Sequence, residues 1–166
     1  MIIQTDTRQQ MKRKHHIDKE NYFISQGHKI IHSKCLVGDY IVPSDGKIAV
    51  DTKQHCNELY QDLISDHERF RNECILAQEC GIKLYIVVEN DCGFRQMDDI
   101  KNWKNPLYFA YLRDKKKGIN RKPPVSNVQL LKVMWTMNKK YGVEFIFCPR
   151  NEAGAKVLEL LGGDKE

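Results

Sequence analysis

The sequence lacks several features that would assign a protein to a class at once. No apolar run approaches the length of a membrane span, and the first residues lack a signal-peptide pattern. The six cysteines contain no CxxC pair, so neither a structural zinc site nor a disulfide framework is indicated. No glycine-rich, phosphate-cradling loop joins a strand to a helix. We therefore expect buried free thiols, a cytoplasmic location and no membrane partner.

What is present is an ordinary composition with a small excess of positive charge. The 166 residues are 41% hydrophobic and 30% charged, which predicts one domain, residues 1–166, with a core of its own. Basic residues number 27 and acidic residues 22, a net charge of +5. This excess mildly favours an anionic partner but does not by itself indicate nucleic-acid binding.

Hydrophobic periodicity predicts alternating strands and helices. We expect strands at 2–5, 29–33, 83–89 and 144–148, and a hairpin formed by 39–42 and 47–52 around the turn Pro43–Gly46. Helices are expected at 17–26, with Tyr22 and Phe23 facing inward, at 57–80, at 126–140, and after a cap at Asn151. An antiparallel meander followed by alternating helices and strands indicates an α/β sheet covered by helices. Residues 91–124 fit least well and are interpreted as an insertion.

Two acids and a lysine lie close together along the predicted hairpin. Asp51 and Lys53 are two residues apart on one strand and therefore project to the same face. If the strands pair, Asp39 comes close to both. Two carboxylates that share a divalent cation, with a lysine beside them, can hydrolyse a phosphodiester. The alternative is an exposed hairpin face on which Lys53 simply pairs with Asp51.

A wider set of motifs appears in order along the chain. These are Asp6-Thr7-Arg8 after the first strand, Gly38-Asp39-Tyr40, Val50-Asp51-Thr52-Lys53, a helix with Arg69-Phe70, and the strand Tyr85–Glu89. In this the chain resembles the nuclease domain of the XPF family of structure-selective endonucleases, in the restriction-endonuclease-like PD-(D/E)xK superfamily. The resemblance covers residues 1 to 90 well and the last helix, strand and helix more loosely.

The resemblance implies a central mixed β-sheet flanked by helices, and a nuclease that uses Mg²⁺ or Mn²⁺. The metal ligands would be Asp39, Asp51 and the Thr52 backbone carbonyl, with Asp6 as a further contributor. Lys53 would position the attacking water or stabilise the charged phosphate. Two positions depart from the family pattern: Gln9 stands where an acid is usual, and Thr52 where an arginine is usual.

Basic residues near these motifs are the candidates for DNA contact. Lys12, Arg13 and Lys14 belong to a run that continues into His15-His16, and such clusters attract DNA phosphates. Arg8 and Arg69 are further candidates, for which a surface ion pair and a structural role are the alternatives. Lys115 to Lys122, with Tyr108 and Tyr111, suggests either a second DNA-contacting loop or a solubilising one. For Glu58 and Asp62, a solvated helix face is favoured over a place at the metal.

The sequence therefore predicts a metal-dependent DNA endonuclease, acting on branched or flapped DNA in recombination or repair. The chain leaves no room for the helix-hairpin-helix module common in XPF relatives. We therefore expect a stand-alone form, of bacterial, phage or mobile-element origin, that grips DNA through basic loops, a homodimer or a partner protein. The alternatives are an inactive DNA-binding or scaffolding domain of the same fold, and an α/β protein-interaction domain.

Overall fold

A computed structural model describes residues 1–8 and 13–162 of the chain. In this part of the chain one mixed sheet of six strands has the order β2-β1-β3-β4-β5-β6. The strands are β1 (Ile2–Thr5), β2 (Lys29–His32), β3 (Tyr40–Ile41), β4 (Ile48–Lys53), β5 (Lys83–Glu89) and β6 (Glu144–Cys148). The expected α/β fold, a central mixed sheet flanked by helices, is confirmed.

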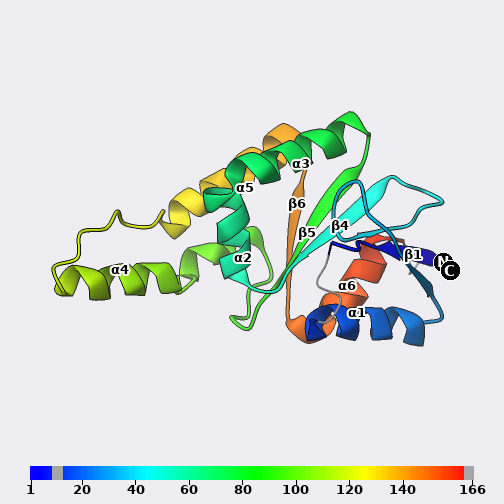
Figure 1. Cartoon of the computed structure of the whole chain (residues 1–166), viewed down its shortest axis with the longest axis horizontal. Coiled ribbons are helices and arrows are strands. Elements are labelled where there is room, and N and C mark those ends of the chain that lie inside the picture. Colours follow the sequence, from blue (N-terminus) through cyan, green and yellow to red (C-terminus); the bar gives the residue numbers. More distant parts are fainter. Residues whose placement is uncertain (9–12, 163–166) are drawn as a thin grey trace.

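Helices cover both faces of the sheet (Figure 1). One face packs against α2 (Cys56–Tyr60), α3 (His67–Glu79) and α5 (Asn127–Tyr141), and the other against α1 (Lys14–Ser25) and α6 (Ala153–Leu160). Alternation along β4 divides the two cores, because Ala49 faces the first layer and Val50 the second. Asp51 and Lys53 share the parity of Ala49, so they point to the α2 and α3 side.

The first two strands are parallel, which corrects the expected antiparallel meander. β1 pairs with β2 in the register Ile2↔Lys29, and α1 forms the crossover between them. A parallel pair requires a long connection, and residues 6–28 supply one that includes a helix. The antiparallel part of the sheet is β1-β3-β4, which contains the predicted hairpin. β4, β5 and β6 are mutually parallel.

The helix expected at 57–80 is interrupted, which is a second correction. α2 ends at Tyr60, a π-helical turn covers Gln61–Ser65, and α3 begins at His67 after Asp66, whose φ of −108° and ψ of 31° are not helical. The interruption lets Asp62 face Lys53 on β4 while Phe70 still faces the sheet. The local sequence favours a helix on both sides but does not encode this tertiary contact.

Smaller differences concern element ends and exposure. α1 starts at Lys14, and Tyr22 is 36% exposed with its ring against Gly154 of α6, whereas Phe23 is buried as expected. Asn151 does not cap the last helix, because a 3₁₀ turn (Arg150–Glu152) precedes α6. The free thiols at positions 80 and 92 are exposed, and the other four are buried. Among the described residues no helix is long and apolar enough to cross a membrane.

The segment interpreted as an insertion divides into a packed part and a protruding part. A 3₁₀ helix (Met97–Asn102) and the side chains of Phe94, Ile100 and Trp103 belong to the core. Residues 104–122, with α4 (Pro106–Lys116), extend away from the sheet at the left of Figure 1. This segment is called the arm below.

Candidate active site

The hairpin places Asp39 opposite Asp51. Tyr40 pairs with Val50 across the antiparallel strands, so the residue before Tyr40 lies opposite the residue after Val50. Directly opposed residues of an antiparallel pair project to the same face. Both residues line the same hollow, and the charge of Asp39 acts on the carboxyl group of Asp51. The expected convergence of Asp39 and Asp51 is therefore present in the geometry.

Asp39 is held in place by Thr52. The backbone N–H and the hydroxyl of Thr52 both donate to Asp39 Oδ2, at 2.9 and 2.8 Å. The Asp39 backbone is fixed too, because its N–H donates to the carbonyl of Val50 at 2.9 Å. Thr52, which departs from the family pattern, thus orients one of the two central carboxylates through its hydroxyl.

Gly38 is required by the close approach of the turn to β4. Its φ is +67°, and a Cβ at this position would lie 3.1 Å from the carbonyl oxygen of Val50. Its N–H donates to Glu73 Oε1 of α3 at 2.9 Å. Burial raises the pKa of Glu73, and the nearby charge of Asp51 adds to this effect. Glu73 is therefore a third acid beside the two central ones, one that the sequence analysis did not identify.

Lys53 bridges two buried acids. Its Nζ lies 2.6 Å from Asp51 Oδ2 and 2.5 Å from Asp62 Oδ2, and those two oxygens have no further hydrogen-bond partner. Burial acts to lower the pKa of Lys53, but the charges of Asp51 and Asp62 outweigh it and raise that pKa above its usual range. Lys53 is therefore a fixed cation and not a proton acceptor.

Asp62 is buried, not solvated as favoured from the sequence. Its other oxygen, Oδ1, accepts a hydrogen bond from Arg69 Nη2 at 2.6 Å, while the Arg69 side chain remains 59% exposed. Arg69 is thus oriented by α3 and Asp62 so that its free donors face the solvent side. The sequence signal for the burial of Asp62 is weak, because its contact with Lys53 joins a π-helical turn to a strand.

The pKa of Asp51 is unusual for an acid. Burial raises the pKa of Asp51 to about 7, with Asp39 acting in the same direction and Lys53 against it. Even with Lys53 beside it, a carboxyl group of this kind holds a proton near neutral pH unless a second cation stabilises the ionised form. Perturbed titration of this kind is common at functional sites.

These residues line a hollow of about 780 Å³. Its walls come from the end of β1, the β3–β4 hairpin, α2, the π-helical turn and α3, and they include Asp6, Asp39, Asp51, Lys53, Asp62 and Glu73. Among the described residues no group of three or more His, Cys, Asp or Glu side chains has the arrangement of a complete metal site. The protein side chains thus offer two close carboxylates, not a closed cage.

Asp6 lies in the wall of the hollow, but its carboxylate is already paired with Arg8. The Arg8 guanidinium binds both carboxylate oxygens of Asp6, its backbone N–H donates to Asp6 Oδ1 at 2.7 Å, and Nη2 also donates to the carbonyl of Cys35 at 3.0 Å. Burial acts to raise the pKa of Asp6, but Arg8 lowers it by more. Asp6 is therefore ionised and paired.

The basic run near α1 is divided by burial. Arg13 is half exposed at the edge of the hollow, 3.8 Å from Glu58 Oε1, and Lys14 is exposed at the start of α1, whereas Lys12 lies outside the described residues. His15 and His16 are buried, and burial lowers the pKa of each to about 4. These two histidines are neutral at pH 7, which corrects their assignment to a charged patch.

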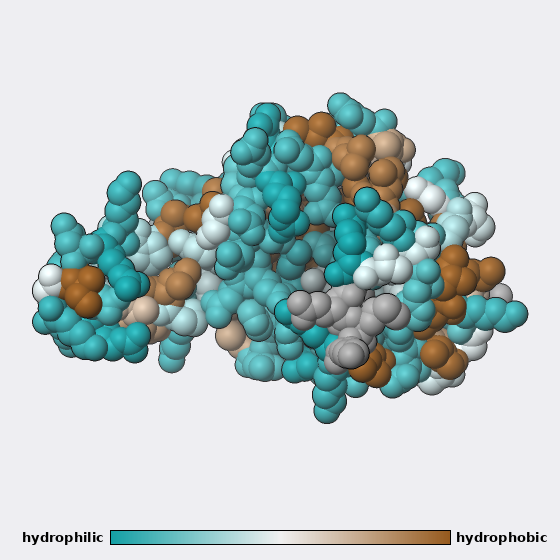
Figure 2. Space-filling model, in the orientation of Figure 1, coloured by the Kyte–Doolittle hydropathy of each residue, from teal (hydrophilic) through white to brown (hydrophobic). Residues whose placement is uncertain are grey.

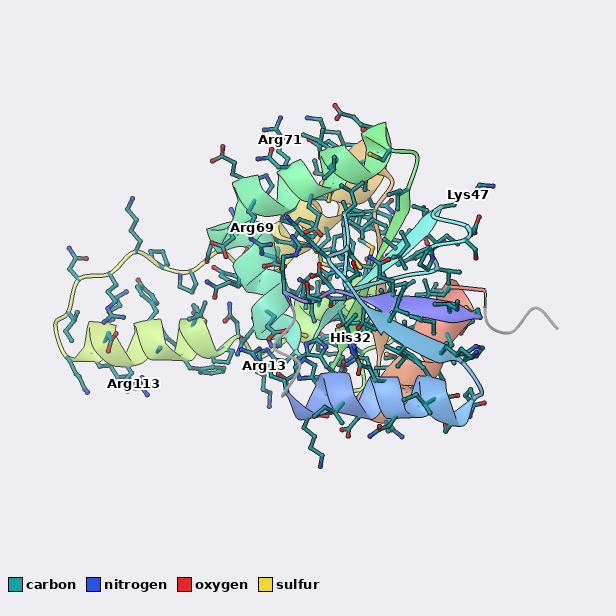
Figure 3. The ribbon with its side chains drawn as sticks, turned by 45° about the vertical axis from the view of Figure 1, so that its right-hand side comes forward. Arg13, His32, Lys47, Arg69, Arg71 and Arg113 are labelled. Carbon is teal, nitrogen blue, oxygen red and sulfur yellow. The ribbon has the colours of Figure 1, made fainter. Side chains whose placement is uncertain are left out.

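In Figure 3, Arg13 and Arg69 border the central region, whereas Arg113 lies apart on α4.

A second buried ion pair lies outside the hollow. Lys19 of α1 binds Glu89 at the end of β5, and both side chains are almost completely buried. Lys19 Nζ also donates to the carbonyl of His15 at 3.1 Å. Burial raises the pKa of Glu89, and Lys19 opposes this. The pair joins α1 to the sheet on the face opposite Lys53.

Comparison with known proteins agrees with this architecture. No protein-family model and no curated protein matches the chain by sequence. The structure of XPF from Aeropyrum pernix superposes with a TM-score of 0.63 at 14% identity, covering 100% of this chain and 62% of that one. The chain has an XPF-like fold.

A second structure, XPF from Aeropyrum pernix in complex with DNA, gives a TM-score of 0.60 at 18% identity, covering 96% of this chain. This chain spans 62% of the length of each of these structures. At such identities the likeness establishes the XPF-like fold, and the expected resemblance to that nuclease domain is confirmed at this level.

Proposed function

We propose that this XPF-like chain is a metal-dependent endonuclease that hydrolyses DNA phosphodiester bonds, with Mg²⁺ or Mn²⁺ as its cofactor. The observation that carries the proposal is the convergence of Asp39, Asp51 and Lys53 in one accessible hollow. We further propose branched or flapped DNA as the substrate, in recombination or repair, and a homodimer or partner protein as an aid to substrate binding.

The residues present fit a hard divalent cation. Mg²⁺ keeps several waters and is commonly bound by one or two carboxylates together with substrate phosphates, so Asp39 and Asp51 are a sufficient pair. Asp51 Oδ2 is buried without a hydrogen-bond partner beyond its contact with Lys53. A cation beside it would favour the ionised form of Asp51. The Thr52 backbone carbonyl is proposed as a further ligand, and Asp6 would join only after its ion pair with Arg8 opens.

Each side chain then has a distinct part in the reaction. A bound divalent ion polarises a phosphoryl oxygen and lowers the pKa of water. Asp39, oriented by Thr52, and Asp51 would hold that ion. Lys53 is a permanent cation, so it orients the attacking water and stabilises negative charge that grows on the phosphate.

Basic side chains around the hollow are proposed to hold the DNA backbone. Arg69 and Arg13 border the hollow with 59% and 48% of their side chains exposed, and Arg8 is exposed at its rim. Lys14 lies next to this group at the start of α1. We propose the same role for Lys12, which lies outside the described residues, from its place in the basic run.

Cleavage of branched, flapped and linear DNA in Mg²⁺ or Mn²⁺ tests the proposal. Metal-dependent product that disappears in Asp51→Asn and Lys53→Met supports it. Lys47→Met is the matched control, because Lys47 is an exposed lysine at the opposite end of β4 from Lys53. Product that persists in Asp51→Asn would place the chemistry elsewhere.

A catalytically inactive DNA-binding or scaffolding domain is the alternative, because Lys53 is paired with two acids and the described residues contain no complete metal cage. DNA binding without cleavage in either ion would favour it. The absence of DNA binding even at low salt would instead favour a protein-interaction domain.

A further inference from the structure

The arm has an unusual concentration of positive charge. Residues 104–122 contain seven of the 27 basic residues and only one of the 22 acidic residues. The arm therefore carries a net charge of +6, and the rest of the chain sums to −1. The single acid, Asp114, forms an ion pair in which its Oδ2 lies 3.2 Å from Arg121 Nε. The net positive charge of the whole chain is thus a property of this one segment.

The arm also exposes apolar and aromatic side chains. No residue of α4 is buried, and Leu107, Tyr108, Phe109 and Leu112 are between 37% and 55% exposed. Isolated helices of this length are only marginally stable in water, so a partner that covers α4 would stabilise the helix. Figure 2 shows brown patches among the teal side chains of the arm, at the left of the view.

Aromatic and basic side chains lie on the same faces of α4. Residues spaced by three or four positions align along a helix, so Phe109 is followed on its face by Arg113 and Lys116. Tyr108 is followed in the same way by Leu112 and Lys115. The Tyr108 and Tyr111 rings lie beside each other, with centroids 6.4 Å apart. A ligand along either face would thus meet rings and then cations.

The base of the arm is fixed to the core beside the candidate active site. Asn127 Nδ2 donates to the carbonyl of Trp103 at 2.6 Å, and the Tyr60 hydroxyl accepts from the N–H of Val125 at 2.9 Å. The Tyr60 and Trp103 rings lie 6.0 Å apart. Tyr60 belongs to α2, whose Asn57 and Glu58 line the hollow. The base of the arm therefore contacts α2, the helix that forms part of the wall of the hollow.

We propose that the arm binds an unpaired nucleic-acid strand, with bases stacked on Tyr108 and Phe109 and phosphates held by Lys115, Lys116 and Lys117. This inference rests on the proposed function for the choice of DNA as the anionic polymer. Stacking on aromatic rings beside a cationic track is how proteins bind single strands without reading sequence. A basic, aromatic arm beside a nuclease site would hold the single-stranded part of a flap or branch while the duplex occupies the hollow.

Binding is measured by fluorescence anisotropy with labelled oligothymidine and with a labelled duplex, in EDTA and over a range of salt concentrations. Tyr108→Leu combined with Phe109→Leu keeps apolar surface and removes the rings. We expect it to weaken single-strand binding at least about fivefold and to leave duplex binding unchanged. Its matched control is Tyr108→Phe combined with Phe109→Tyr, which keeps both rings and should bind as wild type.

The charge component is tested with Lys115→Gln, Lys116→Gln and Lys117→Gln together. The slope of log affinity against log salt for oligothymidine should fall by about 2, which corresponds to three lost phosphate contacts. The control replaces three exposed lysines outside the arm, Lys29, Lys34 and Lys47, with glutamine and should keep the wild-type slope.

Single-strand affinity that is unchanged in the leucine variant, or reduced equally for duplex, would overturn the inference. So would a leucine variant whose only change is from dimer to monomer by sedimentation, because the arm would then be a self-association surface. The experiments distinguish failure of this inference from failure of the nuclease proposal. If cleavage depends on metal but single-strand binding does not depend on the arm, only this inference is wrong. If single-strand binding depends on the arm but the protein neither cleaves DNA nor binds Mn²⁺, only the nuclease proposal is wrong.

Discussion

Thr52 donates two hydrogen bonds to one oxygen of Asp39, one from its backbone and one from its hydroxyl. The backbone bond survives any substitution, so the hydroxyl can be tested alone. We expect Thr52→Val, which has nearly the same shape, to lower Mn²⁺ affinity about tenfold, as loss of an outer-shell contact commonly does. Thr52→Ser keeps the hydroxyl and should bind nearly as wild type. Isothermal titration measures both, and equal affinity of the valine variant and wild type would contradict the orienting role.

Replacement of Lys53 should destabilise the fold as well as abolish cleavage. Lys53→Met leaves Asp51 and Asp62 as buried acids without their partner, which costs about 3–5 kcal/mol of unfolding free energy. Adding Asp62→Asn should recover part of that stability but no cleavage. Chemical denaturation gives the free energies. If Lys53→Met alone were as stable as wild type, the contacts of Lys53 with Asp51 and Asp62 would contribute nothing to the free energy of unfolding.

Divalent metal affinity should rise with pH through neutrality. The pKa of Asp51 is raised from 3.8 to about 7, so at pH 6 most molecules hold a proton that the metal must displace. We expect Mn²⁺ to bind about tenfold more tightly at pH 8 than at pH 6. Electron paramagnetic resonance of free Mn²⁺ measures this directly. A flat profile would mean that Asp51 does not give up a proton to the metal.

The same group affects stability in the metal-free protein. Because the folded state keeps the Asp51 proton up to about pH 7 and the unfolded state releases it near 3.8, stability falls as pH rises across that window. Asp51→Asn should remove this fall. Denaturation in EDTA at several pH values compares the two proteins.

The buried histidines should act in the opposite direction. Burial lowers the pKa of His15 and His16 from 6.5 to about 4, so the unfolded chain takes up protons first as the solution is acidified. Their contribution to stability is complete above pH 6.5 and is lost as pH falls toward 4. His16→Gln should show a shallower acid loss than wild type in thermal melts, and an identical slope would count against burial of a neutral ring.

Gly38 and Gly46 form a matched pair for testing the tight turn. Both have positive φ, but a Cβ would meet β4 only at Gly38, whereas nothing lies within 4 Å at Gly46. Gly46→Ala should cost about 1–2 kcal/mol from the left-handed backbone alone. Gly38→Ala should cost clearly more and should also weaken Mn²⁺ binding, because it displaces Asp39. Equal stability losses in denaturation would remove the argument from close approach.

Much of the site could be predicted because its geometry is local. A four-residue turn from Pro43 to Gly46 fixes the register of the hairpin, and the register places Asp39 opposite Asp51. Lys53 follows from strand alternation. What could not be predicted depends on contacts between distant segments. Glu73 reaches Gly38 from α3, and no periodic pattern marks that residue.

The same distinction explains the errors in the predicted fold. The parallel pairing of β1 and β2 is a choice between topologies that both bury the same strands. The break between α2 and α3 serves the contact from Asp62 to Lys53. His15 and His16 read as part of a charged run because neighbouring residues on the chain are basic, whereas their burial is decided by packing under the hollow.

The Lys19–Glu89 pair sets the rotation of α1 about its own axis. His15 and His16 precede Lys19 by four and three residues, so anchoring Lys19 to the sheet turns both imidazoles toward the hollow. Apolar packing alone would tolerate a small roll of the helix, but an ammonium that must meet a buried carboxylate does not. An ion pair that contacts no reacting group thus determines the outline of the cavity wall on the far side of the sheet.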